Sequence, residues 1–127
     1  MTAVLDTSAL VYWTLDPIKL TSTAQTHIQQ AGRLIVSSIS VWEIGIKVQK
    51  GKLQLPLPVD VFARQLQRVQ GVEIMAVDLE TWLANLALNW THRDPADRTI
   101  VATAIRLNAP LITSDQIIRA YYSQAVW

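Results

Sequence analysis

The chain contains no cysteine, which excludes disulfides, thiolate nucleophiles and most structural zinc sites. Charged residues make up only 17% of its 127 residues and apolar residues 50%, which excludes global disorder. A bilayer-spanning helix needs roughly 20 apolar residues, and the longest apolar run here is only residues 9–13. No basic stretch precedes Asp6, so no signal peptide is visible. We therefore expect a cytoplasmic protein with no membrane association.

The charges that are present are unevenly distributed along the chain. The formal net charge is only +1, from 11 basic and 10 acidic residues. Half of the acidic residues occur in short segments that we expect to form one site, namely Asp6, Glu43, Asp94, Asp97 and Asp115. An acidic centre in basic surroundings suits a metal-dependent enzyme that acts on a polyanion. An ordinary mixed surface is equally compatible with the same counts.

Short apolar runs alternate with helical segments, which predicts βαβ units. The expected strands are residues 3–5, 34–36, 72–77 and 110–113. The expected helices are residues 21–31, 41–50, 59–69, 79–90 and 95–107, with a short helix after the last strand. Helical connections imply a parallel sheet that is covered on both faces. We therefore expect one α/β domain over residues 1–127.

Two acidic residues follow expected strands at their carboxyl ends. Asp6 comes directly after strand 3–5, and Asp115 lies two residues beyond Thr113 at the end of strand 110–113. Ligands of parallel sheets bind beyond this edge. The topology therefore predicts that these distant carboxylates meet, although Asp6, followed by Thr7 and Ser8, also suits a helix N-cap.

Three further acidic residues fall in helical segments. Glu43 has the capping-box spacing from Ser40, but its apolar neighbours indicate a partly buried carboxylate that needs a partner. Lys47, one turn on, suits either an ion pair with Glu43 or a contact to a substrate phosphate. Asp94 and Asp97 fall in the first turn of helix 95–107, where the helix dipole favours negative charge.

A cluster of these carboxylates needs a neutralising cation. Two unit charges about 4 Å apart repel by roughly 4 kcal/mol at an effective dielectric constant near 20. With no cysteine and two histidines, oxygen ligation points to Mg²⁺ or Mn²⁺. These ions support phosphodiester hydrolysis by activated water, without a covalent intermediate. Arg93 and Arg98 are then candidates to bind the phosphate backbone of a polyanionic substrate, although Arg98 also suits a role in orienting Asp97.

Four motifs, in the order LDTSAL, SSISVWEIGIK, HRDPADRTIVATA and LITSD, resemble those of PIN-domain ribonucleases. They are most similar to the VapC-type toxins of bacterial toxin–antitoxin pairs. The resemblance implies a three-layer α/β/α sandwich with a central parallel sheet, a homodimer and an antitoxin partner. It also implies RNA cleavage with Mg²⁺ or Mn²⁺ held by four core acids, here Asp6, Glu43, Asp97 and Asp115, with Asp94 auxiliary. Thr7, Ser8 and Ser114 match polar positions beside these acids, where we expect substrate contacts.

Three other functions remain open at this stage. One is a PIN-type nuclease of RNA processing that is not a toxin. Another is a phosphatase with an aspartyl nucleophile, although Ser8 stands where a second acid would be expected. The third is a non-enzymatic interaction domain in which the acidic residues cap helices.

Overall fold

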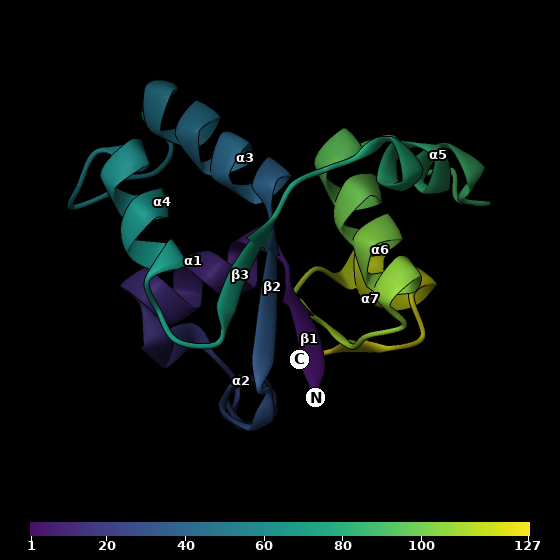
Figure 1. Cartoon of the computed structure of the whole chain (residues 1–127), viewed down its shortest axis with the longest axis horizontal. Helices are drawn as coiled ribbons and strands as arrows, with labels where there is room; N and C mark the ends of the chain where they lie inside the picture. The colour runs from purple at the N-terminus through teal and green to yellow at the C-terminus, as the bar shows by residue number, and fades with distance from the viewer.

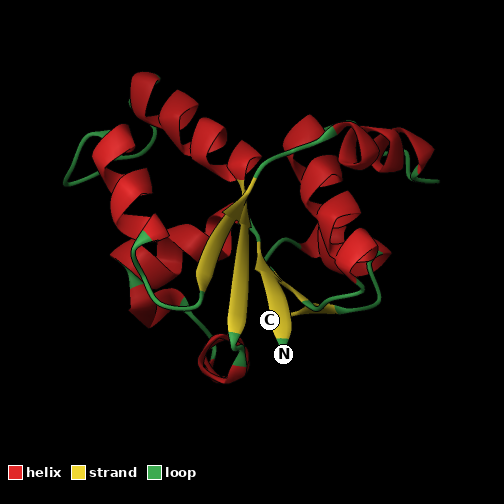
Figure 2. Ribbon diagram, in the orientation of Figure 1, coloured by secondary structure: helices red, strands yellow, loops and turns green.

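The computed structural model describes all 127 residues and is built around five parallel strands. The sheet has the order β3-β2-β1-β4-β5. The strands are β1 (Thr2–Leu5), β2 (Arg33–Ser37), β3 (Val72–Met75), β4 (Leu111–Ile112) and β5 (Ala125–Val126). Helices cover both faces of this sheet, so the molecule is a three-layer α/β/α sandwich, as expected (Figures 1 and 2).

Seven α-helices and one short 3₁₀ helix connect the strands. They are α1 (Thr7–Leu15), η1 (Pro17–Lys19), α2 (Ser22–Gln30), α3 (Ser38–Gln49), α4 (Val59–Gln67), α5 (Leu79–Ala87), α6 (Pro95–Leu107) and α7 (Gln116–Tyr121). None of them has the length and hydropathy that a membrane span requires. Helices α3 and α6 begin on opposite sides of the carboxyl edge of the sheet (Figure 1).

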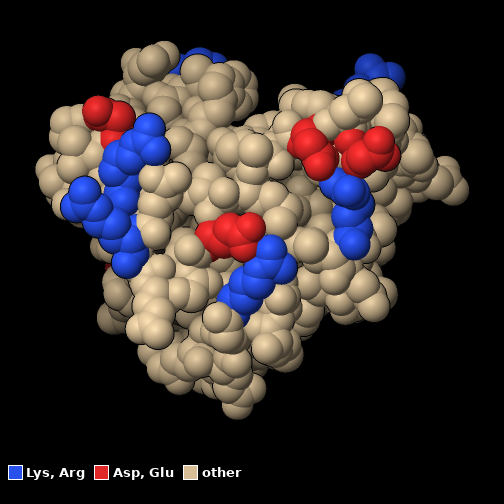
Figure 3. Space-filling model, in the orientation of Figure 1, with Lys and Arg blue, Asp and Glu red and all other residues tan.

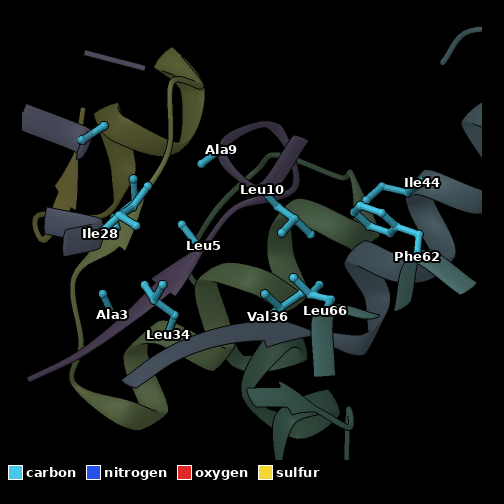
Figure 4. Close-up of a cluster of buried hydrophobic side chains, with 12 residues drawn as sticks. Ala3, Leu5, Ala9, Leu10, Ile28, Leu34, Val36, Ile44, Phe62 and Leu66 are labelled. Atoms are coloured by element: carbon cyan, nitrogen blue, oxygen red, sulfur yellow. The ribbon is translucent and has the colours of Figure 1, made fainter. Parts of the chain in front are cut away.

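Alternation of side chains along the central strands produces two hydrophobic cores. Ala3 and Leu5 of β1 point into one core, which also contains side chains from α1, α2, α3 and α4 (Figure 4). Val4 points into the other core, where it packs with side chains of α6 and α7. Buried apolar area supplies most of the favourable free energy of folding. Because both faces are buried, the central strands β1 and β2 each contain three consecutive apolar residues.

Several element boundaries differ from the sequence-based expectation. The helix expected at 41–50 begins at Ser38, because Ser37 rather than Ser40 caps it by accepting a hydrogen bond from the Ile39 amide. The capping-box interpretation of Ser40 is therefore wrong. The strand expected at 72–77 ends at Met75, and the helix expected at 79–90 ends at Ala87. Strand β5 was not anticipated, because two residues carry no periodic signal.

Candidate active site

A small polar cavity of about 150 Å³ lies at the carboxyl edge of the sheet. No hydrophobic residue lines it. Its lining consists of four carboxylates, three hydroxyls and one ammonium group, namely Asp6, Glu43, Asp97, Asp115, Thr7, Ser8, Ser114 and Lys47. The fold thus brings together acids that are up to 109 positions apart in the sequence, from Asp6 to Asp115. We call this space the acid cavity.

Asp6 is the most deeply buried of the four acids, with 4% of its surface exposed. Its Oδ1 accepts a hydrogen bond from the Thr7 amide (2.8 Å), as the N-cap of α1. Its Oδ2 accepts from the hydroxyls of Thr113 (2.6 Å) and Ser8 (3.2 Å). Burial raises the pKa of Asp6 above its ordinary value, against the lowering effect of these donors, and the charge of Glu43 adds to the rise.

Asp97 lies in the first turn of α6 and contacts His92 in the preceding loop. The His92 Nε2 and the Asp97 Oδ2 are 2.7 Å apart. Burial, together with the negative charges of Asp94, Asp6 and Asp115, raises the pKa of Asp97 to about 6, although the hydrogen bond with His92 acts in the opposite direction.

Glu43 carries a buried oxygen without a partner. Its Oε1 makes no hydrogen bond, while its Oε2 lies 3.9 Å from Lys47 Nζ. An unpaired buried carboxylate oxygen costs free energy unless a proton or cation compensates it. The position of this oxygen beside the acid cavity therefore suits a cation held there.

The remaining cavity residues fix the relative positions of the helix ends. Asp115 caps α7, and its Oδ1 accepts hydrogen bonds from the amides of Ile117 (2.8 Å) and Ile118 (3.1 Å). The Thr7 hydroxyl donates to Ser40 (2.8 Å) and so ties α1 to α3. The hydroxyls of Ser8 and Ser114 are 3.4 Å apart. Because Thr7 is itself buried, its main contribution is to hold the wall of the acid cavity in place.

Three sequence-predicted site residues do not line the acid cavity. Asp94 is exposed and caps α6, where its Oδ1 accepts from the Asp97 amide (2.9 Å). Arg93 is exposed and takes part in no ion pair. Arg98 points into the protein, so the expectation that it binds RNA is not supported. Arg98 makes no hydrogen bond to Asp97, so any orienting effect on Asp97 acts through the loop that carries His92.

The guanidinium of Arg98 fastens the loop between α5 and α6. Its Nη1 donates to the carbonyl oxygens of Trp90 (2.7 Å) and His92 (3.0 Å). Its Nη2 donates to the carbonyl of Asn85 (2.7 Å), and its Nε to the side-chain oxygen of the same residue (3.3 Å). Arg98 therefore supports the segment that carries His92.

We expect Arg98→Met to lower the free energy of unfolding by about 2–3 kcal/mol, because several partly buried carbonyls lose a charged donor. Urea denaturation measures this change. Arg93→Met is the matched control, because its exposed side chain predicts a change within about 0.5 kcal/mol. Equal stabilities of the two variants would contradict the structural role of Arg98.

The acid cavity fits a hard divalent cation by its chemistry. Its donors are all oxygen atoms, apart from Lys47, and they include the unpaired Glu43 Oε1. Oxygen donors are those that Mg²⁺ and Mn²⁺ prefer. No three acidic side chains are already spaced to hold one ion. Mutual repulsion of carboxylates keeps such groups apart, so binding requires side-chain adjustment.

Thr113 is a site residue that the sequence analysis did not single out. Its buried hydroxyl donates to Asp6 Oδ2 and accepts from the Asp115 amide (3.0 Å). It therefore links the acids that follow β1 and β4. The only sequence signal is its place at the end of the strand, within the motif LITSD.

Comparison with known proteins places this arrangement in a family. The family model described as PIN domain matches residues 3–123. Ribonuclease VapC22 of Mycobacterium tuberculosis is 31% identical over 121 residues, which covers 94% of this chain and 92% of that protein.

Solved structures share the fold at lower sequence identity. A toxin-antitoxin complex from Klebsiella pneumoniae matches with a TM-score of 0.68 and 18% identity, over 98% of this chain and 96% of that chain. The VapBC2 structure from Rickettsia felis, bound to a DNA fragment from its promoter, matches with a TM-score of 0.65 and 16% identity. The match covers 95% of this chain and 93% of that chain. Because the family model matches nearly the whole length of this chain, the chain belongs to the PIN domain family.

Proposed function

We propose that this protein is an endoribonuclease that depends on Mg²⁺ or Mn²⁺ and acts as the toxin of a toxin–antitoxin pair. The observation that carries the proposal is the acid cavity, where four carboxylates from distant segments meet and one of them, Glu43, has a buried oxygen without a hydrogen-bond partner. The 31% identity to a protein named Ribonuclease VapC22 supports RNA as the substrate. A cytoplasmic location is part of the same proposal, because RNA is an intracellular substrate.

The cavity residues have separable roles in this proposal. Asp6, Glu43, Asp97 and Asp115 hold the cation, which when bound supplies positive charge to the phosphate and lowers the pKa of water. Lys47 lines the cavity and is well exposed, so its ammonium group is available to a phosphate oxygen. Ser8 donates to Asp6, and no histidine lines the acid cavity, so the cavity lacks the serine–histidine pair of covalent serine hydrolases.

An antitoxin is the expected protein partner. The solved structures that share this fold include a toxin-antitoxin complex from Klebsiella pneumoniae. The acid cavity, with its excess of carboxylates, suits insertion of a basic side chain from such a partner. A cationic side chain there would neutralise the same charges as the metal ion and would block the phosphate.

The experiment that tests the proposed function is cleavage of a labelled RNA. The purified protein is incubated with RNA in EDTA, and Mg²⁺ or Mn²⁺ is then added in excess. We expect no cleavage in EDTA and internal cleavage after addition of either ion. Cleavage that persists in EDTA would contradict metal dependence, and no cleavage under any condition would favour a non-enzymatic interaction domain.

A homodimer is part of the proposal, and helix α5 presents the face that suits it. Leu79, Trp82, Leu83 and Leu86 form an exposed apolar stripe at helical spacing, and Leu86 is 76% exposed. The exposed Trp42 of α3 lies across a hollow of about 450 Å³ that Trp82 also lines. Figure 3 shows an uncharged hollow between the α3–α4 and α5–α6 lobes. Large exposed apolar patches typically mark protein interfaces.

We expect Leu83→Glu to weaken the dimer at least about tenfold, because it places a charge in the centre of the apolar stripe. Light scattering over a concentration series should then report the 14.2 kDa monomer where the unmodified protein has twice that mass. Ile18→Glu is the control, because Ile18 is exposed on η1 outside the stripe. A mass unaffected by Leu83→Glu would exclude this face as the interface.

A further inference from the structure

A second cavity, of about 440 Å³, lies beside the acid cavity and has no role so far. Trp90, Gln116, Ile117, Ala120 and Tyr121 line it, with one amide among apolar and aromatic groups. The Trp90 and Tyr121 rings stack, with centroids 4.5 Å apart and an interplanar angle of 8°. We call this space the aromatic cavity.

Two links join residues that line the aromatic cavity to residues that line the acid cavity. The His92 ring lies 4.8 Å from the Trp90 ring, and its Nε2 contacts Asp97 at 2.7 Å. On the other side, Gln116 directly follows Asp115 at the start of α7. When a phosphate lies in the acid cavity, the adjoining nucleotide is therefore within reach of the aromatic cavity.

The composition of the aromatic cavity suits a nucleobase. Flat aromatic and apolar walls stack on the face of any base, and the exposed amide of Gln116 can donate to or accept from a base edge. The exposed Arg93 and Arg119 lie in the two segments that border this cavity, so positive charge is available for the backbone of the same nucleotide. Ile117 is 53% exposed, which leaves the entrance accessible to solvent.

We propose that the aromatic cavity binds an unpaired base of the RNA, in a nucleotide next to the bond that is cut. This inference rests on the proposed function and adds a base-binding subsite to it. A base in a duplex has both faces covered by its neighbours, whereas an unpaired base is free to stack on protein.

The test uses a single-stranded RNA whose cut position is mapped, and a series of copies with one abasic nucleotide each. For the unmodified protein, we expect the abasic nucleotide at one position beside the cut to lower kcat/KM by about fivefold or more, since one stacked base contributes about 1–3 kcal/mol. Tyr121→Leu should abolish this penalty, because the intact base no longer gains from stacking. Tyr121→Phe should retain it.

Tyr12→Leu is the matched control, because Tyr12 packs on Trp127 away from both cavities and its loss should leave the penalty unchanged. If Tyr121→Leu fails to fold, as judged by circular dichroism, Ile117→Glu replaces it in the abasic test. The exposed side chain of Ile117 lines the same cavity. Ile117→Glu should also abolish the penalty.

The outcomes separate this inference from the proposed function. RNA left uncut by the unmodified protein would overturn both. Cleavage with the same abasic penalty in every variant would overturn the base site alone. If Ile117→Glu changes the mass of the assembly and leaves the abasic penalty unchanged, the aromatic cavity binds a protein partner. That result would also overturn the base site.

Discussion

Replacing Asp6 with asparagine is expected to reduce RNA cleavage by roughly 10²–10³-fold without destabilising the metal-free protein. The loss follows because Asp6 is a central charged donor of the acid cavity, and a bound cation contributes several kcal/mol to stabilising charge in the transition state. Cleavage rates in excess Mn²⁺ measure this loss.

The stability part of this prediction follows from burial. Asp6 is almost fully buried and its pKa is raised, so its ionised form is disfavoured in the folded protein. Asparagine has no charge, and its side-chain oxygen can still accept from the Thr7 amide, as Asp6 Oδ1 does. We therefore expect a melting temperature in EDTA at neutral pH that is equal to or higher than that of the unmodified protein.

Asp78→Asn is the matched control for this experiment. Asp78 also caps a helix, but it is exposed, and hydrogen bonds from Thr81 hold its pKa below the ordinary value. Its ionised form is thus favoured on folding, so Asp78→Asn should lower stability and leave cleavage unchanged. If Asp6→Asn instead behaves like this control, Asp6 is only a helix cap.

Mn²⁺ at about 100 times its dissociation constant is expected to stabilise the protein by about 2.7 kcal/mol. For a chain of this size, that corresponds to a rise in melting temperature of about 10 °C. The effect should be larger at pH 7.5 than at pH 5, because Asp97 has a pKa of about 6 and must lose its proton to bind the ion. Thermal melts at both pH values measure it.

The metal-free protein should show the opposite dependence on pH. The folded pKa of Asp97, about 6, lies above its ordinary value of 3.8, so the folded state holds this proton more tightly than the unfolded state. Asp97 therefore favours folding at low pH, and this contribution is lost as the pH rises from about 4 through 6. Melts in EDTA across this range measure the loss.

Asp97→Asn is the control for the pH dependence of both the Mn²⁺ effect and the metal-free stability, because it removes the titrating group. Its melting temperature in EDTA should fall less between pH 4 and pH 7, and Mn²⁺ should raise it less. An unchanged response to Mn²⁺ in this variant would show that the ion binds outside the acid cavity.

Much of the fold was predictable because its signals are local. The apolar runs at 3–5 and 34–36 coincide with β1 and β2 to within one residue at each end, and helix 95–107 has the expected bounds. Pro95 at its first position and Asp94 before it are strong start signals. The start of α3 was missed because Ser37, Ser38 and Ser40 are all acceptable caps by sequence.

The amino-acid sequence by itself determined the chemical nature of the site. Acidic residues at two strand ends and in a helix start, with no cysteine, provide oxygen atoms, which are the ligands that hard cations prefer. Residue type and local position are sufficient for this, because a parallel sheet collects its strand ends at one edge.

Only the tertiary structure decided which polar groups face the acid cavity. It turned Arg98 inward to the carbonyls of the α5–α6 loop, gave Asp94 to a helix cap, and placed the Thr113 hydroxyl between two acids. It also joined Trp90 and Tyr121, 31 positions apart, into one stacked pair. Such choices depend on which donors and acceptors packing brings within reach, and neither sequence spacing nor local propensity encodes those distances.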